Sequence, residues 1–172
     1  MPNFKIFNII SFYIYWWVSI WAASEEKYFI GPLLAVISFI IHFVVIEEKM
    51  KELYLLLVCF IIGILLENSF INFGIIEYKG ILFEFYGISP LWVLLLWIGF
   101  GLTLFHSSIF ILGKFKLSFL LGFIFGPIIY FSAHKFGSLT LKLSYLHSYL
   151  ILGISMGLIV LLINIIAVKV YD

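Results

Sequence analysis

Arginine is absent from this 172-residue sequence, and only 11% of its residues are charged. All ten basic residues are lysines that lie scattered along the chain, so no concentrated basic face exists for binding nucleic acid. Cysteine occurs once, as Cys59, which excludes an intrachain disulfide and a cysteine-based metal cluster. About a quarter of the residues in an ordinary soluble domain are charged. This chain therefore does not have the composition of a soluble domain.

Apolar residues take the place of the missing charges. They make up 65% of the sequence, and the mean hydropathy is +1.22. Crossing about 30 Å of hydrocarbon takes about 20 apolar residues, and in lipid a helix satisfies its own backbone hydrogen bonds. Strands of a membrane barrel would alternate every second residue, which these segments do not do. We expect an all-α bundle of six transmembrane helices that forms one domain over residues 1–172. The expected helices are 4–24, 29–46, 53–73, 91–112, 117–134 and 148–168.

The connections between these helices predict their order in space and their orientation. Short connections at 25–27, 47–52 and 113–116 should make successive helices antiparallel neighbours. The longer connections at 75–90 and 137–147 are expected to lie at the membrane interface as half-turns or small hairpins. Lysines number six on the side that holds both termini and four on the other side, which favours cytoplasmic termini.

Glu67 is the most informative polar residue, because it is the one carboxylate well inside an expected span. It lies roughly 20 Å from the cytoplasmic start of its helix. An ionisable group at such a depth costs at least ~2.5 kcal/mol and usually faces the bundle interior. Glu67 is therefore either a structural acid that joins two helices or a group for proton transfer or substrate binding. The side chains expected near it, as packing residues or as the wall of a pocket for an amphipathic molecule, are Asn68, Trp17, Trp21 and Trp97.

Two histidines, His42 and His106, fall at a similar shallow depth in the cytoplasmic half. Together with Asn8 and Asn164 they predict a polar patch or a shallow cavity. The histidines are either interior hydrogen-bonding groups or, with Glu67, candidate catalytic residues. A metal site would need Glu67, which lies about 10 Å deeper, and the paired Glu-x-x-His spacing of bundle metal sites is missing. We therefore expect neither a metal ion nor a cofactor.

Two pairs of glycines, each with small-xxx-small spacing, mark the last two helices. Gly122 and Gly126 form one pair, and Gly153 and Gly157 form the other. Such spacing lets helix backbones approach closely. Tight packing is expected on both helices, against a partner helix that the sequence does not specify. Membrane lipids are the other expected partners.

The order of short motifs resembles a family of small bacterial inner-membrane proteins known as domain of unknown function 2878. The resemblance covers nearly the whole chain, although Phe105 stands where the family pattern has Asn. It implies six helices and a location in the bacterial inner membrane, and it implies no reaction. The matching residues are Asn8, Trp16, Trp17, Gly31, Pro32, His42, Glu67, residues 90–92, Trp97, residues 103–107, Gly126, Pro127 and Tyr130.

Three classes of function remain open. The first is an intramembrane enzyme, or an accessory to one, that acts on a lipid or another apolar substrate through Glu67, with His42 and His106 as a second polar layer. The second is a small transporter or channel subunit, for which one proline-broken helix is the supporting feature. The third is a structural or assembly protein in which the polar groups join helices. The sequence contains no nucleophile-and-base motif, phosphate-binding loop or haem-attachment motif that would favour the first class.

Overall fold

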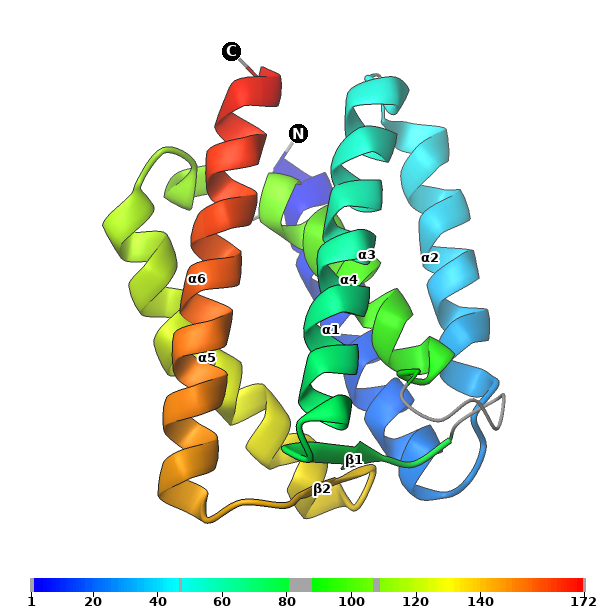
Figure 1. Cartoon of the computed structure of the whole chain (residues 1–172). Coiled ribbons are helices and arrows are strands. Elements are labelled where there is room, and N and C mark those ends of the chain that lie inside the picture. Colours follow the sequence, from blue (N-terminus) through cyan, green and yellow to red (C-terminus); the bar gives the residue numbers. More distant parts are fainter. Residues whose placement is uncertain (1, 47, 81–87, 107–108, 172) are drawn as a thin grey trace.

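A computed structural model describes residues 2–46, 48–80, 88–106 and 109–171 of the chain. Within these residues the chain forms six α-helices, which confirms the predicted helical class, together with one short 3₁₀ helix and two short strands (Figure 1). The elements are α1 (Pro2–Ser24), α2 (Ile30–Val45), α3 (Lys49–Asn72), β1 (Ile76–Tyr78), α4 (Leu91–His106), η1 (Ile109–Ile111), α5 (Phe115–Phe136), β2 (Leu139–Leu141) and α6 (Tyr145–Tyr171).

Four of the helices, α1, α3, α5 and α6, are long and apolar enough to cross a membrane. Helices α2 and α4 are apolar but have 16 residues each, which corresponds to about 24 Å of rise. That length falls short of the roughly 30 Å hydrocarbon core. The outward faces of the bundle carry large exposed apolar side chains, such as Leu33, Leu65 and Phe125. By length and composition the structure thus supports four of the six predicted spans.

The fourth helix ends earlier than predicted. We expected it to reach residue 112, but α4 ends at His106, and residues 107–108 lie outside the described part of the chain. The chain then turns through η1, where Asn164 of α6 bonds to the backbone. Its Nδ2 donates to the Ile111 carbonyl at 2.8 Å, and its Oδ1 accepts from the Gly113 N–H at 3.0 Å. A side chain from a distant helix thus holds the backbone in a tight turn.

Helix α4 is central to one part of the bundle, since it packs against α1, α2 and α3. Helices α5 and α6 form a closely packed antiparallel hairpin, which meets the other helices through contacts of α6 with α3 and of α5 with α1. Of the helices joined by short connections, α1 and α2 pack closely as predicted, whereas α2 with α3 and α4 with α5 do not pack closely within the described residues. Both chain termini lie toward the end of the bundle opposite the strands (Figure 1).

The two longer connections pair with each other, whereas the sequence predicted a separate turn or hairpin in each. Strand β1 runs antiparallel to β2, with Ile76 opposite Leu141 and Tyr78 opposite Leu139. In both strands the outer residues are buried and the middle one is exposed, which is the two-residue alternation of a half-buried sheet. The all-α prediction missed this ribbon because each strand is only three residues long.

Helices α5 and α6 pack against each other, and glycines lie at their closest approach. A Cβ added to Gly122 would lie 2.9 Å from the Gly157 Cα. A Cβ added to Gly153 would lie 3.0 Å from the Phe123 carbonyl oxygen, and one on Gly157 would lie 3.0 Å from the Phe119 carbonyl oxygen. The missing side chains therefore allow backbone-to-backbone approach.

Candidate functional site

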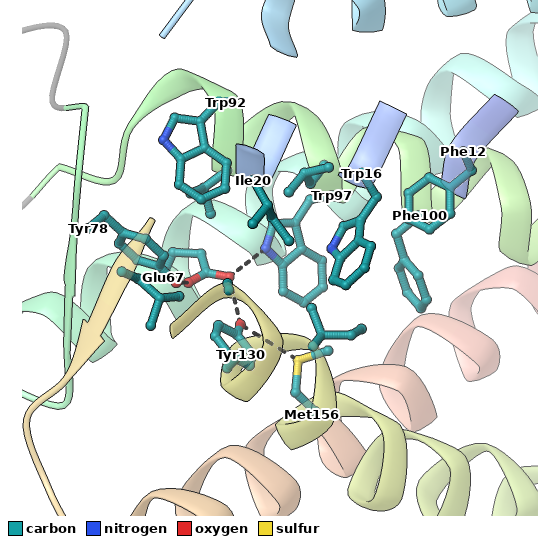
Figure 2. A pocket seen from close by; sticks show the side chains of 15 residues that line it. Phe12, Trp16, Ile20, Glu67, Tyr78, Trp92, Trp97, Phe100, Tyr130 and Met156 are labelled. Atoms are coloured by element: carbon teal, nitrogen blue, oxygen red, sulfur yellow. Dashed lines mark hydrogen bonds between the residues drawn. The ribbon is translucent and has the colours of Figure 1, made fainter. Parts of the chain in front are cut away.

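Glu67 lies completely buried where α3, α4, α5 and β1 meet (Figure 2). Its Oε1 accepts hydrogen bonds from the Trp97 indole Nε1–H at 2.8 Å and from the Tyr130 hydroxyl at 2.7 Å. Its Oε2 accepts a hydrogen bond from the Tyr78 hydroxyl. We call these four residues the Glu67 cluster. The structure thus brings Glu67 and Trp97 together, as the sequence suggested, and adds two tyrosines.

Local features of the sequence allow this cluster to form. Gly63 lies one turn before Glu67 on α3, and a Cβ there would come within 2.8 Å of the Trp97 Cβ. Its lack of a side chain leaves room for the indole against α3. Tyr78 lies on the buried face of β1, and burial raises its pKa well above the ordinary tyrosine value. Tyr78 therefore stays protonated and acts as a hydrogen-bond donor to the carboxylate.

The Glu67 cluster forms part of the wall of a partly open cavity of about 80 Å³, hereafter the Glu67 pocket. The remaining wall is apolar or aromatic, and it comes from helices α1 and α4 on one side and from the α5–α6 hairpin on the other. The Tyr130 hydroxyl lies 3.9 Å from the Met156 sulfur, so α6 also borders the cluster. The other lining residues are Phe12, Trp16, Ile20, Trp92, Val93, Leu96, Phe100, Ile129, Ala133 and Leu139.

Trp17 and Trp21 do not line the Glu67 pocket, in contrast to the interpretation from sequence. Both are exposed on the outer face of α1, at 42% and 44%. Trp17 packs on the Phe136 ring at 5.2 Å, and the Lys27 ammonium lies 4.9 Å from the Trp21 ring centroid. Trp16 lines the pocket instead. Adjacent residues on a helix point about 100° apart, and the sequence did not reveal which of the two neighbouring tryptophans faces inward.

Asn68 does not line the Glu67 pocket and instead contacts the segment that precedes α4. Its Oδ1 accepts hydrogen bonds from both the backbone N–H and the hydroxyl of Ser89, each at 2.8 Å. Ser89 lies two residues before the start of α4. Asn68 therefore attaches the beginning of α4 to the end of α3, close to the Glu67 cluster along the chain.

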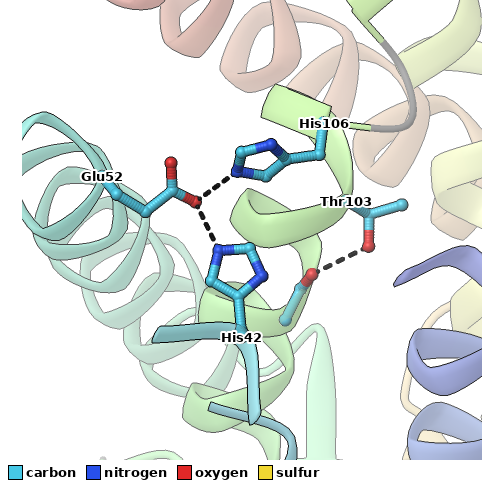
Figure 3. Close-up of polar contacts among 5 residues, drawn as sticks. His42, Glu52, Thr103 and His106 are labelled. Atoms are coloured by element: carbon cyan, nitrogen blue, oxygen red, sulfur yellow. Dashed lines mark hydrogen bonds and ion pairs between the residues drawn. The ribbon is translucent and has the colours of Figure 1, made fainter. Parts of the chain in front are cut away.

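The second polar site lies toward the opposite end of the bundle, where His42 and His106 converge on Glu52 (Figure 3). The His42 Nε2 lies 3.1 Å and the His106 Nε2 lies 2.9 Å from the same oxygen, Glu52 Oε1. The two imidazole ring centroids are 4.9 Å apart. We call these three residues the His42 cluster. The structure confirms that the two histidines lie together and adds a carboxylate.

Glu52 was missed because the sequence analysis assigned residues 47–52 to a connection. Helix α3 begins at Lys49 instead, and Glu52 is buried in its first turn. Glu67, the carboxylate that the sequence offered as a partner of the histidines, lies 15 residues, or about 22 Å, farther along the helix than Glu52. With α3 beginning at Lys49, its buried residues recur with helical spacing at Glu52, Leu55, Cys59, Gly63 and Glu67, which places both acids on the inward side of the helix.

The predicted patch of four polar residues is divided in the structure. Asn164 bonds to the turn at η1 and donates to the Ser118 hydroxyl. Asn8 and His42, in contrast, line one small cavity of about 30 Å³. Three other polar residues, Ser11, Ser38 and Thr103, also line this cavity.

Comparison with known proteins places the chain in a family. No curated protein and no solved structure matches it. A family model described as "Protein of unknown function (DUF2878)" matches residues 5–162, a segment that contains both clusters. The chain belongs to the DUF2878 family, as its motifs suggested.

Proposed function

We propose that this protein resides in the bacterial inner membrane and binds the hydrocarbon part of a lipid or similar amphipathic molecule in the Glu67 pocket. The observation that carries this proposal is a partly open apolar cavity bordered by helices long enough to cross a membrane. Ligand pockets typically combine apolar walls with a few convergent polar groups, which here are the members of the Glu67 cluster.

The size of the pocket indicates which part of a molecule it receives. A cavity of 150 Å³ holds one benzene molecule, and this cavity measures about 80 Å³. A whole lipid is far too large for it. The end of an acyl or isoprenoid chain fits, with the rest of the molecule leaving through the open side of the pocket.

The contacts of Glu67 favour a binding function over acid–base catalysis. A catalytic acid or base exchanges a proton with its substrate across a hydrogen bond of about 2.6–3.2 Å. Both oxygens of Glu67 already accept hydrogen bonds from Trp97, Tyr130 and Tyr78. We infer that Glu67 holds the aromatic walls of the pocket in place, in a lipid-binding protein or an accessory to a lipid enzyme.

The orientation of the chain is part of the proposal. Both termini lie at the same end of the bundle (Figure 1), which agrees with an even number of crossings. The lysine bias favours the cytoplasm for that end. The His42 cluster then lies near the cytoplasmic surface, and the Glu67 cluster lies in the outer half of the membrane.

A photoreactive fatty acid that carries a diazirine on its chain tests this proposal. The purified full-length protein in detergent is labelled, digested and mapped by mass spectrometry. We expect saturable adducts on pocket residues such as Val93 and Leu139, which an excess of unlabelled fatty acid removes.

Two adjacent residues of α5 provide a matched pair of variants. Both are exposed, at 36% for Ile129 and 50% for Ile128, but Ile129 lines the pocket and Ile128 does not. Ile129→Trp should narrow the pocket and reduce the saturable labelling, while Ile128→Trp should leave it unchanged. Labelling that stays unsaturable, or that both variants retain equally, would show only general contact with lipid and would refute the proposal.

A further inference from the structure

We propose that His42, Glu52 and His106 form a binding site for a divalent first-row transition metal ion such as Zn²⁺. Two imidazoles and one carboxylate are the protein ligands of several catalytic zinc sites and of non-haem iron sites. Each of the three residues comes from a different helix, α2, α3 or α4. The site would therefore join three helices at the end of the bundle that holds the termini.

The geometry of the His42 cluster is close to that of a metal site. One ligand atom from each residue lies within 4.8 Å of the other two. Metal–ligand bonds of about 2.0–2.1 Å in a tetrahedral zinc site place neighbouring ligand atoms roughly 3.3 Å apart. The two N···O distances of 3.1 and 2.9 Å are already near that value. Small side-chain rotations about the shared oxygen would open the space for an ion.

These three ligands lie inside the protein, unlike a cluster of charged residues on a surface. The side chains of Glu52 and His42 are 3% and 4% exposed, and that of His106 is 19% exposed. A carboxylate at such a site is costly unless it is paired with positive charge. A divalent cation supplies this charge while both imidazoles remain neutral, as metal ligation requires. The partly exposed His106 provides a path from solvent.

Zinc sites with three protein ligands keep water in the fourth position. Water would reach an ion here from the side of His106, which is partly exposed. The small cavity beside His42 is lined by neither Glu52 nor His106, so it supplies no ligand. Because Glu52 and Glu67 are about 22 Å apart along α3, this site is separate from the Glu67 pocket, and the inference is independent of the proposed function.

Metal binding is measured on the full-length protein in detergent, freed of metal with a chelator and purified without a histidine tag. Titration with Zn²⁺ alone should show one ion per chain. Zinc-edge X-ray absorption should show two imidazole nitrogens among the ligands. We expect Glu52→Gln and His106→Gln each to raise the Kd for Zn²⁺ by more than about 100-fold, the upper end of the effect of residues that only orient a ligand.

The remaining two histidines serve as matched controls, because they lie near the other end of the bundle. His147→Gln and His134→Gln should leave the Kd for Zn²⁺ unchanged. Two results for the wild-type protein would overturn the proposal. These are binding of fewer than one Zn²⁺ ion per chain and a zinc-edge absorption spectrum without imidazole ligands. The proposal would also be overturned if Glu52→Gln and His106→Gln both eluted as folded protein and both still bound Zn²⁺. In that case the cluster would be a hydrogen-bonded contact between helices.

Discussion

Replacing Glu67 with leucine should strongly destabilise the protein, although leucine is the better residue for a membrane interior. The carboxylate is the acceptor for the Trp97 indole and for the hydroxyls of Tyr78 and Tyr130. Glu67→Leu would leave three buried donors without that acceptor. Each unsatisfied buried donor costs about 1–3 kcal/mol, so we expect a total loss of about 3–9 kcal/mol. That is a large part of the 5–15 kcal/mol by which typical proteins are stable.

Glu67→Gln should cost much less. The amide oxygen can still accept from Trp97 and Tyr130, while the amide nitrogen donates to the Tyr78 oxygen. One donor, the Tyr78 O–H, then loses its acceptor, at about 1–3 kcal/mol. In a chain of this length 1 kcal/mol shifts the melting temperature by about 2–4 °C. Glu67→Leu should therefore melt at least about 6 °C below wild type, and Glu67→Gln should lie between the two.

The assay is the fraction of monodisperse protein that survives heating in detergent, measured by size-exclusion chromatography. Glu48→Leu serves as the control, because Glu48 is an exposed carboxylate at the other end of α3. It should change stability by no more than about 0.5 kcal/mol. If Glu67→Leu unfolds during purification, Glu67→Gln still measures the cost of one lost acceptor.

A combined variant tests the cause of the loss. Glu67→Leu together with Tyr78→Phe and Tyr130→Phe removes the acceptor and two of its three donors, so it should recover a large part of the lost stability. Removing both partners of a hydrogen bond can be nearly neutral, whereas removing one is not. A Glu67→Leu protein as stable as wild type, or a combined variant less stable than Glu67→Leu, would show that Glu67 does not stabilise the protein as the acceptor for these donors.

Two further predictions concern the packing and the orientation of the helices. Gly122→Leu should destabilise the protein by at least about 1–3 kcal/mol, the usual cost of overpacking, because even a Cβ there lies 2.9 Å from the Gly157 Cα. Heated size-exclusion chromatography measures this loss, and Leu120→Ala at an exposed site of α5 is the control. Fusion of a fluorescent protein that folds only in the cytoplasm should give fluorescence at either terminus. A dark fusion that is expressed at equal level would contradict the cytoplasmic orientation.

The helices and the inward position of Glu67 could be predicted from sequence because their signals are local. Apolar runs of membrane-spanning length and a lone carboxylate within one of them can be read along a single segment. The glycine spacing likewise predicted close packing of the last two helices, and Gly122 and Gly157 meet as that spacing requires. These features depend on the helical period and on the cost of polar groups in lipid.

The partners of the polar residues were decided by tertiary structure. The donors to Glu67 are 11, 30 and 63 residues away from it along the chain. No local pattern selects Tyr78 from the ten tyrosines, and only the family resemblance marks Tyr130. Glu52 looked like a charge in a connection until α3 was seen to begin at Lys49. Periodicity describes one helix at a time, whereas a hydrogen-bonded cluster depends on how several helices and a strand pair pack around one buried group.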